Sequence, residues 1–99
     1  MTTINEIIND IERFVKAGNY EMFYVEAKEF KDKKKVKVKV KVPIEGNRTL
    51  CLCSFTASYK YFIMFYRKLD RRFSKQYRRE VWCFVKENHT FYKYYRKET

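Results

Sequence analysis

The stretch KVKVKVKV, residues 35–42, alternates strictly between lysine and valine. Side chains of a β-strand point alternately to its two faces, so this pattern places the valines on one face and the lysines on the other. Such a strand is half-buried, with its valine face against a core and its lysine face in solvent. We therefore expect residues 35–42 to belong to a sheet that is buried on one face.

The neighbouring segments extend this strand into a meander. Residues 20–30, YEMFYVEAKEF, are rich in Tyr, Phe and Val and predict a preceding strand, with residues 31–34 as the turn. Pro43 is expected to end the second strand, residues 45–47 form a turn, and residues 48–56 (RTLCLCSFT) predict a third strand. Three sequential strands with short joints are typical of an antiparallel meander.

The N-terminal region predicts an amphipathic helix over residues 3–17. Its apolar side chains recur at helical spacing and form one face: Ile4, Ile7, Ile8, Ile11 and Val15. Thr3 and Glu6 have the spacing of a capping box, and Gly18 is placed to end the helix in the left-handed conformation. We expect the isoleucine face to pack on the valines of the sheet.

The last part of the chain is less decisive, because it contains neither Gly nor Pro after Ala57. Residues 59–66 (YKYFIMFY) fit a fourth strand or the start of a helix. An apolar arc then predicts a helix over about residues 67–80; it consists of Tyr66, Leu69, Phe73 and Tyr77. Residues 81–99 either extend that helix or fold back at residues 88–89.

These elements predict a single α+β domain over residues 1–99. We expect a three- or four-stranded, mainly antiparallel sheet covered on one face by an N-terminal helix and a C-terminal helix.

The chain carries a net charge of +11, with a net of −3 in residues 1–30 and +14 in residues 31–99. Such an excess repels itself in a compact protein, and a polyanionic partner is one reason to retain it. Solubility and an anionic membrane surface are the alternatives.

The segment 67–80, RKLDRRFSKQYRRE, carries the most informative charge pattern. On a helix, its basic side chains form a stripe away from the apolar arc, and Trp82 joins the stripe if the helix runs one turn further. Arginine suits phosphate and tryptophan offers a stacking face for bases. The candidate nucleic-acid-binding residues are Arg67, Arg71, Arg72, Lys75, Arg78, Arg79 and Trp82. The alternative is a solvated face braced by ion pairs, for which this segment has two acids, Asp70 and Glu80.

Two further patterns allow two interpretations each. Lys37 and Lys39, in the lysine row, have a spacing that can follow a phosphate backbone, and we include them as auxiliary binding residues. Lysines on an exposed edge strand also protect against aggregation. The aromatic tail, residues 91–97 (FYKYYRK), permits stacking on bases but is equally typical of a core edge or a dimer contact.

The three cysteines and the one histidine predict neither a metal site nor an active site. Cys51 and Cys53 should share a strand face, but C-x-C is not the usual zinc spacing, even with Cys83 and His89 added. Buried thiols, or a disulfide from Cys83 to the strand, are the alternatives. No P-loop, dinucleotide fingerprint, HExxH or nucleophile elbow is present in the sequence. We expect no catalytic activity, no metal and no cofactor.

The chain is expected to be intracellular and not secreted. Its first residues do not form a signal peptide, and the longest mostly apolar stretch, residues 59–66, is too short to span a bilayer. An odd number of cysteines also argues against a secreted disulfide framework.

In its length, its KDKKKVKVKVKV run, its aromatic tail and its few Gly and Pro residues, the chain resembles small basic proteins of filamentous viruses. These are the lipothrixviruses and rudiviruses, which infect hot-spring archaea. The resemblance implies a thermostable and acid-stable protein in the host cytoplasm, with no assigned biochemical role. The leading hypothesis is sequence-tolerant nucleic-acid binding. The alternative is a protein–protein interaction module, either a homodimer or a host-directed viral protein.

Overall fold

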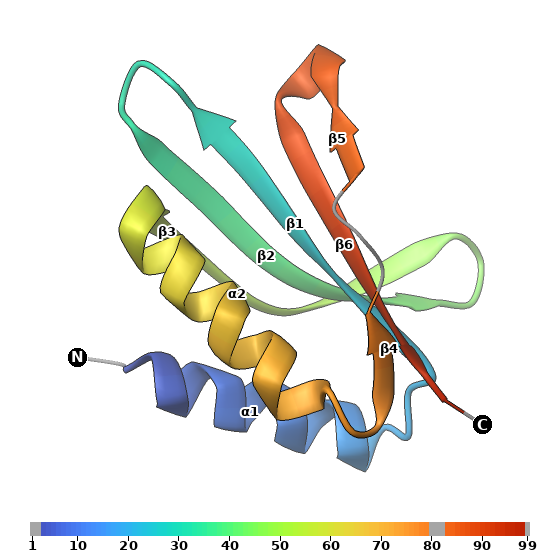
Figure 1. Cartoon of the computed structure of the whole chain (residues 1–99). Coiled ribbons are helices and arrows are strands. Elements are labelled where there is room, and N and C mark those ends of the chain that lie inside the picture. The colour runs from blue at the N-terminus through green and yellow to red at the C-terminus, as the bar shows by residue number, and fades with distance from the viewer. Residues whose placement is uncertain (1–2, 80–82, 99) are drawn as a thin grey trace.

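In the computed structural model, which describes residues 3–79 and 83–98, two helices lie on one face of a twisted antiparallel sheet (Figure 1). The elements in chain order are α1 (Ile4–Ala17), β1 (Met22–Phe30), β2 (Lys35–Ile44), β3 (Arg48–Ser58), α2 (Tyr59–Phe73), β4 (Tyr77–Arg79), β5 (Cys83–Val85), a short 3-10 helix (Lys86–Asn88) and β6 (Thr90–Lys97). The α+β class is confirmed.

Within the described residues the sheet has six strands, more than the three or four expected. Its order is β3-β2-β1-β6-β4, and β5 also pairs with β6. The meander of β1, β2 and β3 is confirmed, with both hairpin turns in the predicted places. The strand β6 returns from the end of the chain to lie antiparallel beside β1. This return makes β1 an interior strand, and β2 is interior because it lies between β1 and β3.

The predicted C-terminal helix is wrong, because the second helix lies in the middle of the chain, directly after β3. Residues 59–66 form its start, where the Ser58 side chain accepts a hydrogen bond of 3.2 Å from the Tyr61 amide. The helix ends at Phe73, and residues 77–79 pair with β6 instead of continuing it. Residues 83–98 fold back with residues 88–89 as the joint, which was one of the two predicted alternatives.

The predicted core is confirmed. The buried residues of α1 are Ile4, Ile8, Ile11 and Val15, and those of β2 are Val36, Val38, Val40 and Val42. Both sets belong to one apolar cluster, against which Ile7 packs from a partly buried position. α2 adds the buried Phe65, Leu69 and Phe73. The side chains of both helices therefore cover the valine face of the sheet.

Helix α1 begins as predicted but ends differently. Thr3 caps it, with its hydroxyl oxygen accepting a hydrogen bond of 3.2 Å from the Glu6 amide. Gly18 is not left-handed, since its φ is −84°, and Asn19 takes that conformation with a φ of 50°. A Cβ atom at Gly18 would approach the Tyr20 ring to 2.3 Å. The glycine is required there by the close approach of Tyr20 rather than by its own backbone conformation.

Pro43 does not end β2, which continues to Ile44. Strand β1 pairs with β2 only as far as Lys41, whereas β3 pairs with it as far as Ile44. At Pro43 one side of β2 therefore has no partner strand, so the missing N–H is tolerated.

Candidate nucleic-acid interface

The helices leave the opposite face of the sheet uncovered, and we call this the open face (Figure 1). Residues directly opposite one another in neighbouring strands share a face, so the pairing register identifies its members. Those that matter here are Tyr24, Glu26, Lys28, Lys37, Lys39, Lys41, Arg78, Tyr92, Tyr94 and Arg96. Because β2 lies between β1 and β3, its lysines are not on an edge strand, and the edge-protection alternative for Lys37 and Lys39 is wrong.

Two pairs of like charges lie directly opposite each other on this face. Lys28 of β1 is opposite Lys37 of β2, and Arg78 of β4 is opposite Arg96 of β6. Like charges in this position destabilise a sheet. The two pairs lie toward opposite ends of the open face, since β6 places Arg96 six residues beyond Thr90, the partner of Lys28.

Glu26 is the one acid among the described strand residues of the open face, and Lys41 neutralises it. The Nζ atom of Lys41 lies 3.2 Å from Oε2 of Glu26, and both side chains are about four-fifths buried. Burial acts to lower the pKa of Lys41, but the contact with Glu26 outweighs it and raises that pKa above its ordinary value. Lys39 is directly opposite Glu26 in the pairing register, whereas Lys28 and Lys37 are opposite each other and not opposite a carboxylate.

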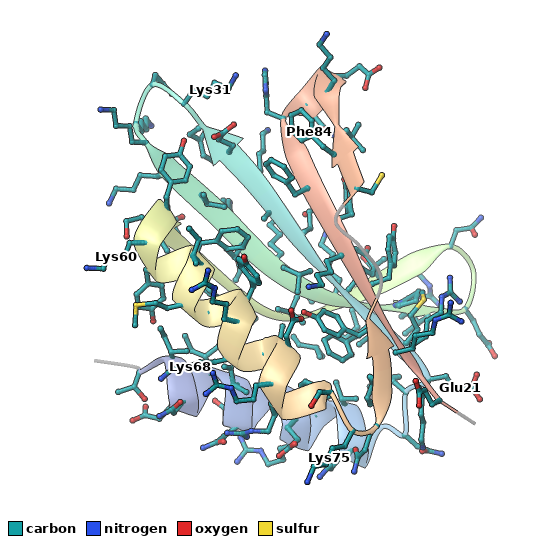
Figure 2. All side chains as sticks on the ribbon, in the orientation of Figure 1. Glu21, Lys31, Lys60, Lys68, Lys75 and Phe84 are labelled. Atoms are coloured by element: carbon teal, nitrogen blue, oxygen red, sulfur yellow. The ribbon has the colours of Figure 1, made fainter. Side chains whose placement is uncertain are left out.

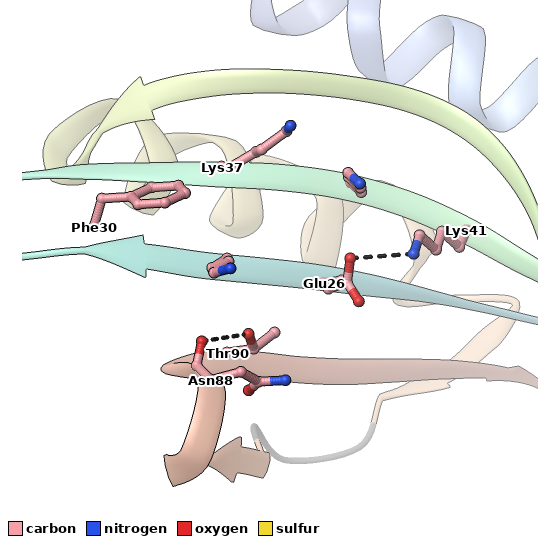
Figure 3. A pocket seen from close by; sticks show the side chains of 8 residues that line it. Glu26, Phe30, Lys37, Lys41, Asn88 and Thr90 are labelled. Atoms are coloured by element: carbon pink, nitrogen blue, oxygen red, sulfur yellow. Dashed lines mark hydrogen bonds and ion pairs between the residues drawn. The ribbon is translucent and has the colours of Figure 1, made fainter.

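A hollow of about 380 Å³ lies over this part of the sheet (Figure 3). Its lining combines four lysines with one carboxylate and a few polar and apolar side chains: Glu26, Lys28, Phe30, Lys37, Lys39, Lys41, Asn88 and Thr90. Thr90 is held by a hydrogen bond of 3.0 Å to the carbonyl oxygen of Asn88. The hollow is therefore cationic and open, which suits an anionic group of an extended ligand.

Three tyrosines lie between the two cation pairs. The rings of Tyr24 and Tyr94 have centroids 5.3 Å apart, and those of Tyr24 and Tyr92 are 6.3 Å apart. Burial raises the pKa of Tyr24, with Lys41 acting in the opposite direction, and burial together with Glu26 raises the pKa of Tyr92. Both hydroxyl groups therefore remain uncharged at neutral pH and add no negative charge to the face.

The predicted helical stripe is not assembled. Arg67 and Arg71 are exposed on α2, but Lys75 lies in the turn after it (Figure 2). Arg78 lies on the open face. Arg79 ends β4, and Trp82 lies outside the described residues. The stripe fails because the helix stops at Phe73, so the 3.6-residue spacing does not extend to residue 78.

Cations do gather at the junction of α1 and α2. A second hollow, of about 440 Å³, is lined by Asn5, Lys68, Arg71, Arg72 and Lys75. Arg72 is engaged with α1, since its guanidinium donates a hydrogen bond of 2.6 Å to Asn9 and lies 3.5 Å from Glu12. Its first role is therefore to join the two helices. We call Lys68, Arg71 and Lys75 the helical patch.

Asp70 does not brace the helical patch, because it points into the protein. Its carboxylate accepts a hydrogen bond of 2.7 Å from Lys93 Nζ and another from the Tyr95 hydroxyl. Lys93 is 8% exposed, and its Nζ also lies 5.5 Å from the centre of the Tyr66 ring. Sequence reasoning missed this network. The sequence does contain a signal for it, because Lys93 lies between Phe91 and Tyr95 on the same face of a strand. A lysine buried at such a position needs an acidic partner.

Contrary to the prediction, Cys51 and Cys53 do not share a face of the sheet. A β-bulge between Val40 and Lys41 sets Cys53 opposite the buried Val40 and Cys51 opposite Lys41 of the open face. Cys51 and Cys83 are exposed, and all three thiols are free. Across the residues that the structure describes, no three His, Cys, Asp or Glu side chains come together as metal ligands.

No family model, curated protein or solved structure is significantly similar to this chain. The resemblance to small proteins of archaeal filamentous viruses thus stays a prediction. In the described parts of the chain, neither helix is long and apolar enough to cross a membrane.

Proposed function

We propose that this protein binds nucleic acid, with little sequence preference, through the open face of its sheet. The observation that carries the proposal is the arrangement of two like-charged pairs, Lys28 with Lys37 and Arg78 with Arg96, on either side of a tyrosine cluster. Phosphate groups would turn the Lys28–Lys37 repulsion into attractive contacts and could also be reached by Arg78 and Arg96. Aromatic rings accept any base by stacking.

Electrostatics favours the open face over the helical patch. On the open face, the one strand carboxylate within the described residues is already engaged by Lys41, and the opposed cations are on paired strands. In the helical hollow, Arg72 is joined to Asn9 and Glu12 of α1. An anion at the helices would compete with these contacts, whereas one at Lys28 and Lys37 would relieve a repulsion.

The test compares two variants that remove the same charge from opposite sides of the molecule. Lys28→Gln with Lys37→Gln neutralises the open face, and Lys68→Gln with Arg71→Gln neutralises the helical patch. Each lost phosphate contact should reduce the slope of log affinity against log salt by about 0.7 on single strands and about 0.9 on B-form DNA. We expect the first variant to lose roughly two contacts and the second far less, as measured by fluorescence anisotropy at several salt concentrations.

A larger loss in the helical variant would move the interface to α2. If the parent protein binds neither single-stranded nor duplex nucleic acid at physiological salt, the proposal fails. Circular dichroism spectra of both variants should match the parent, because all four side chains are at the surface of their elements.

One observation favours the second candidate function, a protein–protein interaction module. Strand β3 is at an edge of the sheet, and its residues 49–58 contain no charged residue, Pro or Gly. Natural proteins usually protect edge strands with such residues, and an unprotected edge is suited to addition of a strand from another chain. Sedimentation equilibrium tests the homodimer form: a concentration-dependent dimer that Thr56→Lys abolishes would support it, and a monomer at high concentration would oppose it.

A further inference from the structure

We infer that the ligand of the open face is a single strand of nucleic acid rather than a duplex, an inference that rests on the proposed function. The observation behind it is the position of Tyr24, Tyr92 and Tyr94 among the cations. Cations alone would serve any polyanion, but rings contribute only where the faces of bases are accessible.

The tyrosines come from the two central strands of the sheet. Tyr24 of β1 is directly opposite Tyr94 of β6, and Tyr92 is opposite Glu26. The planes of Tyr24 and Tyr94 are inclined by 36°, and those of Tyr24 and Tyr92 by 48°. All three side chains are partly exposed. They therefore form one aromatic surface across β1 and β6 on which successive bases can lie.

A duplex does not fit this surface. Its bases are stacked in its interior, and only their edges are accessible in the grooves. The major groove is about 12 Å wide and admits a helix or a two-stranded ribbon. The five strands from β3 to β4 span about 19 Å, at about 4.8 Å between neighbours, so the open face cannot enter the groove. Against a duplex, the cations would meet phosphates while the tyrosines met no base.

A single strand fits both the cations and the rings. From Thr90, opposite Lys28, to Arg96, opposite Met22, β6 advances by six residue steps, or about 20 Å. Tyr92 and Tyr94 lie within that length, two and four residues after Thr90. A segment of a few nucleotides can therefore place phosphates at both cation pairs and bases on the rings between them. This length is at the lower end of the roughly 4–16 nucleotides that one OB-fold binds.

The first experiment uses the full protein and three ligands of equal length at about 0.15 M salt: a 20-nucleotide oligothymidine, an abasic strand with the same phosphates, and a 20-base-pair duplex. We expect the oligothymidine to bind at least about tenfold tighter than the abasic strand, because only the former can stack. We also expect it to bind tighter than the duplex. Equal affinity for the oligothymidine and the abasic strand, or preference for the duplex, would overturn the inference while leaving nucleic-acid binding intact.

The second experiment tests one ring. Tyr94→Leu should weaken binding of the oligothymidine by about 5- to 150-fold, the range for loss of one stacked base. Its affinity for the abasic strand should be unchanged. Tyr94→Phe keeps the ring and serves as the matched control, with binding close to that of the parent. If the leucine variant loses the same factor on both ligands, Tyr94 does not stack and the inference fails. If the parent binds none of the ligands, it is the proposed function that fails.

Discussion

Lys93 occupies a position of β6 where the strand alternation predicts an apolar side chain. Its buried charge is compensated by a contact with an acidic residue. Its ammonium group contacts Asp70 at 2.7 Å, and the same carboxylate accepts a hydrogen bond from the Tyr95 hydroxyl. A buried ion pair gives little net stability compared with apolar residues, but removal of one partner leaves an uncompensated charge. The network joins Asp70 of α2 to Lys93 and Tyr95 of β6.

We expect Asp70→Asn to lower the free energy of unfolding by roughly 3–5 kcal/mol, because it leaves the Lys93 charge without its counterion. Adding Lys93→Met to that variant should restore most of the loss. Asp10→Asn removes an exposed bridge to Arg13 and should cost at most about 1 kcal/mol. Denaturation with guanidinium chloride measures the free energy of unfolding of all three variants. A loss of similar size from Asp10→Asn would show that the Asp70 effect does not come from burial.

Burial raises the pKa of the Cys53 thiol from 9.0 to about 12, with the neighbouring Cys51 acting in the same direction. The unfolded chain releases this proton first, so Cys53 contributes stability that is complete below about pH 9 and is lost as the pH rises toward 12. At pH 9, iodoacetamide should label the exposed Cys51 and Cys83 rapidly and Cys53 slowly, since the thiolate is the nucleophile. Peptide mass spectrometry measures the rate of labelling at each cysteine. Equal rates at all three thiols would contradict the buried environment of Cys53.

Elements with a complete local signal could be predicted from the sequence. Helix α1 carries a cap, an apolar face and a terminating glycine within about one helix length, and β2 carries an unbroken alternation. By contrast, the apolar spacing of Leu69, Phe73 and Tyr77 continues past the end of α2. All three are buried, but Tyr77 lies on β4, after the turn that follows the helix. Residues 77–79 form a strand because they pair with β6, and no local sequence pattern indicates that pairing.

The candidate site was predictable to a similar extent. The lysine row and the aromatic tail are visible in the sequence, so Lys37, Lys39 and the tyrosines of residues 91–97 could be singled out. Their assembly depends on β6 lying beside β1, which brings Tyr94 opposite Tyr24 across about seventy residues of chain. The opposed pairs Lys28–Lys37 and Arg78–Arg96 depend on register in the same way. The choice of the open face over the helices as the proposed interface therefore depends on the tertiary structure.

The contact between α1 and the sheet should be sensitive to the loss of one side chain. Ile8 is 1% exposed, so Ile8→Ala removes buried methyl groups and leaves a cavity, and we expect a cost of about 2–5 kcal/mol. Ile63→Ala, at a site that is 39% exposed on α2, should cost much less. Thermal and denaturant unfolding give both values. A wild-type melting temperature for Ile8→Ala would contradict the packing of α1 on the valine face.

At the scale of the whole molecule, a charge of +11 opposes compaction, and the open face concentrates part of that repulsion at the proposed binding surface. Stability and binding should therefore respond in opposite directions to a change at Lys28. The side chain lies directly opposite Lys37, and an acid in its place would convert a like-charge pair into an attractive one.

We expect Lys28→Glu to raise the free energy of unfolding by about 0.2–1 kcal/mol at low salt, because cross-strand charge pairs are of this size. The gain should shrink in 1 M salt, where the screening length falls to about 3 Å. Binding to oligothymidine should weaken in the same variant. Lys86→Glu makes the same change of net charge beside Glu87 in the 3-10 helix, at a position outside the pairing register of β1 and β2, and should give no such gain. If both variants gain equally, the net charge and not the register of β1 on β2 sets the repulsion. If Lys28→Glu is more stable and still binds as the parent does, the opposed lysines are not part of the interface.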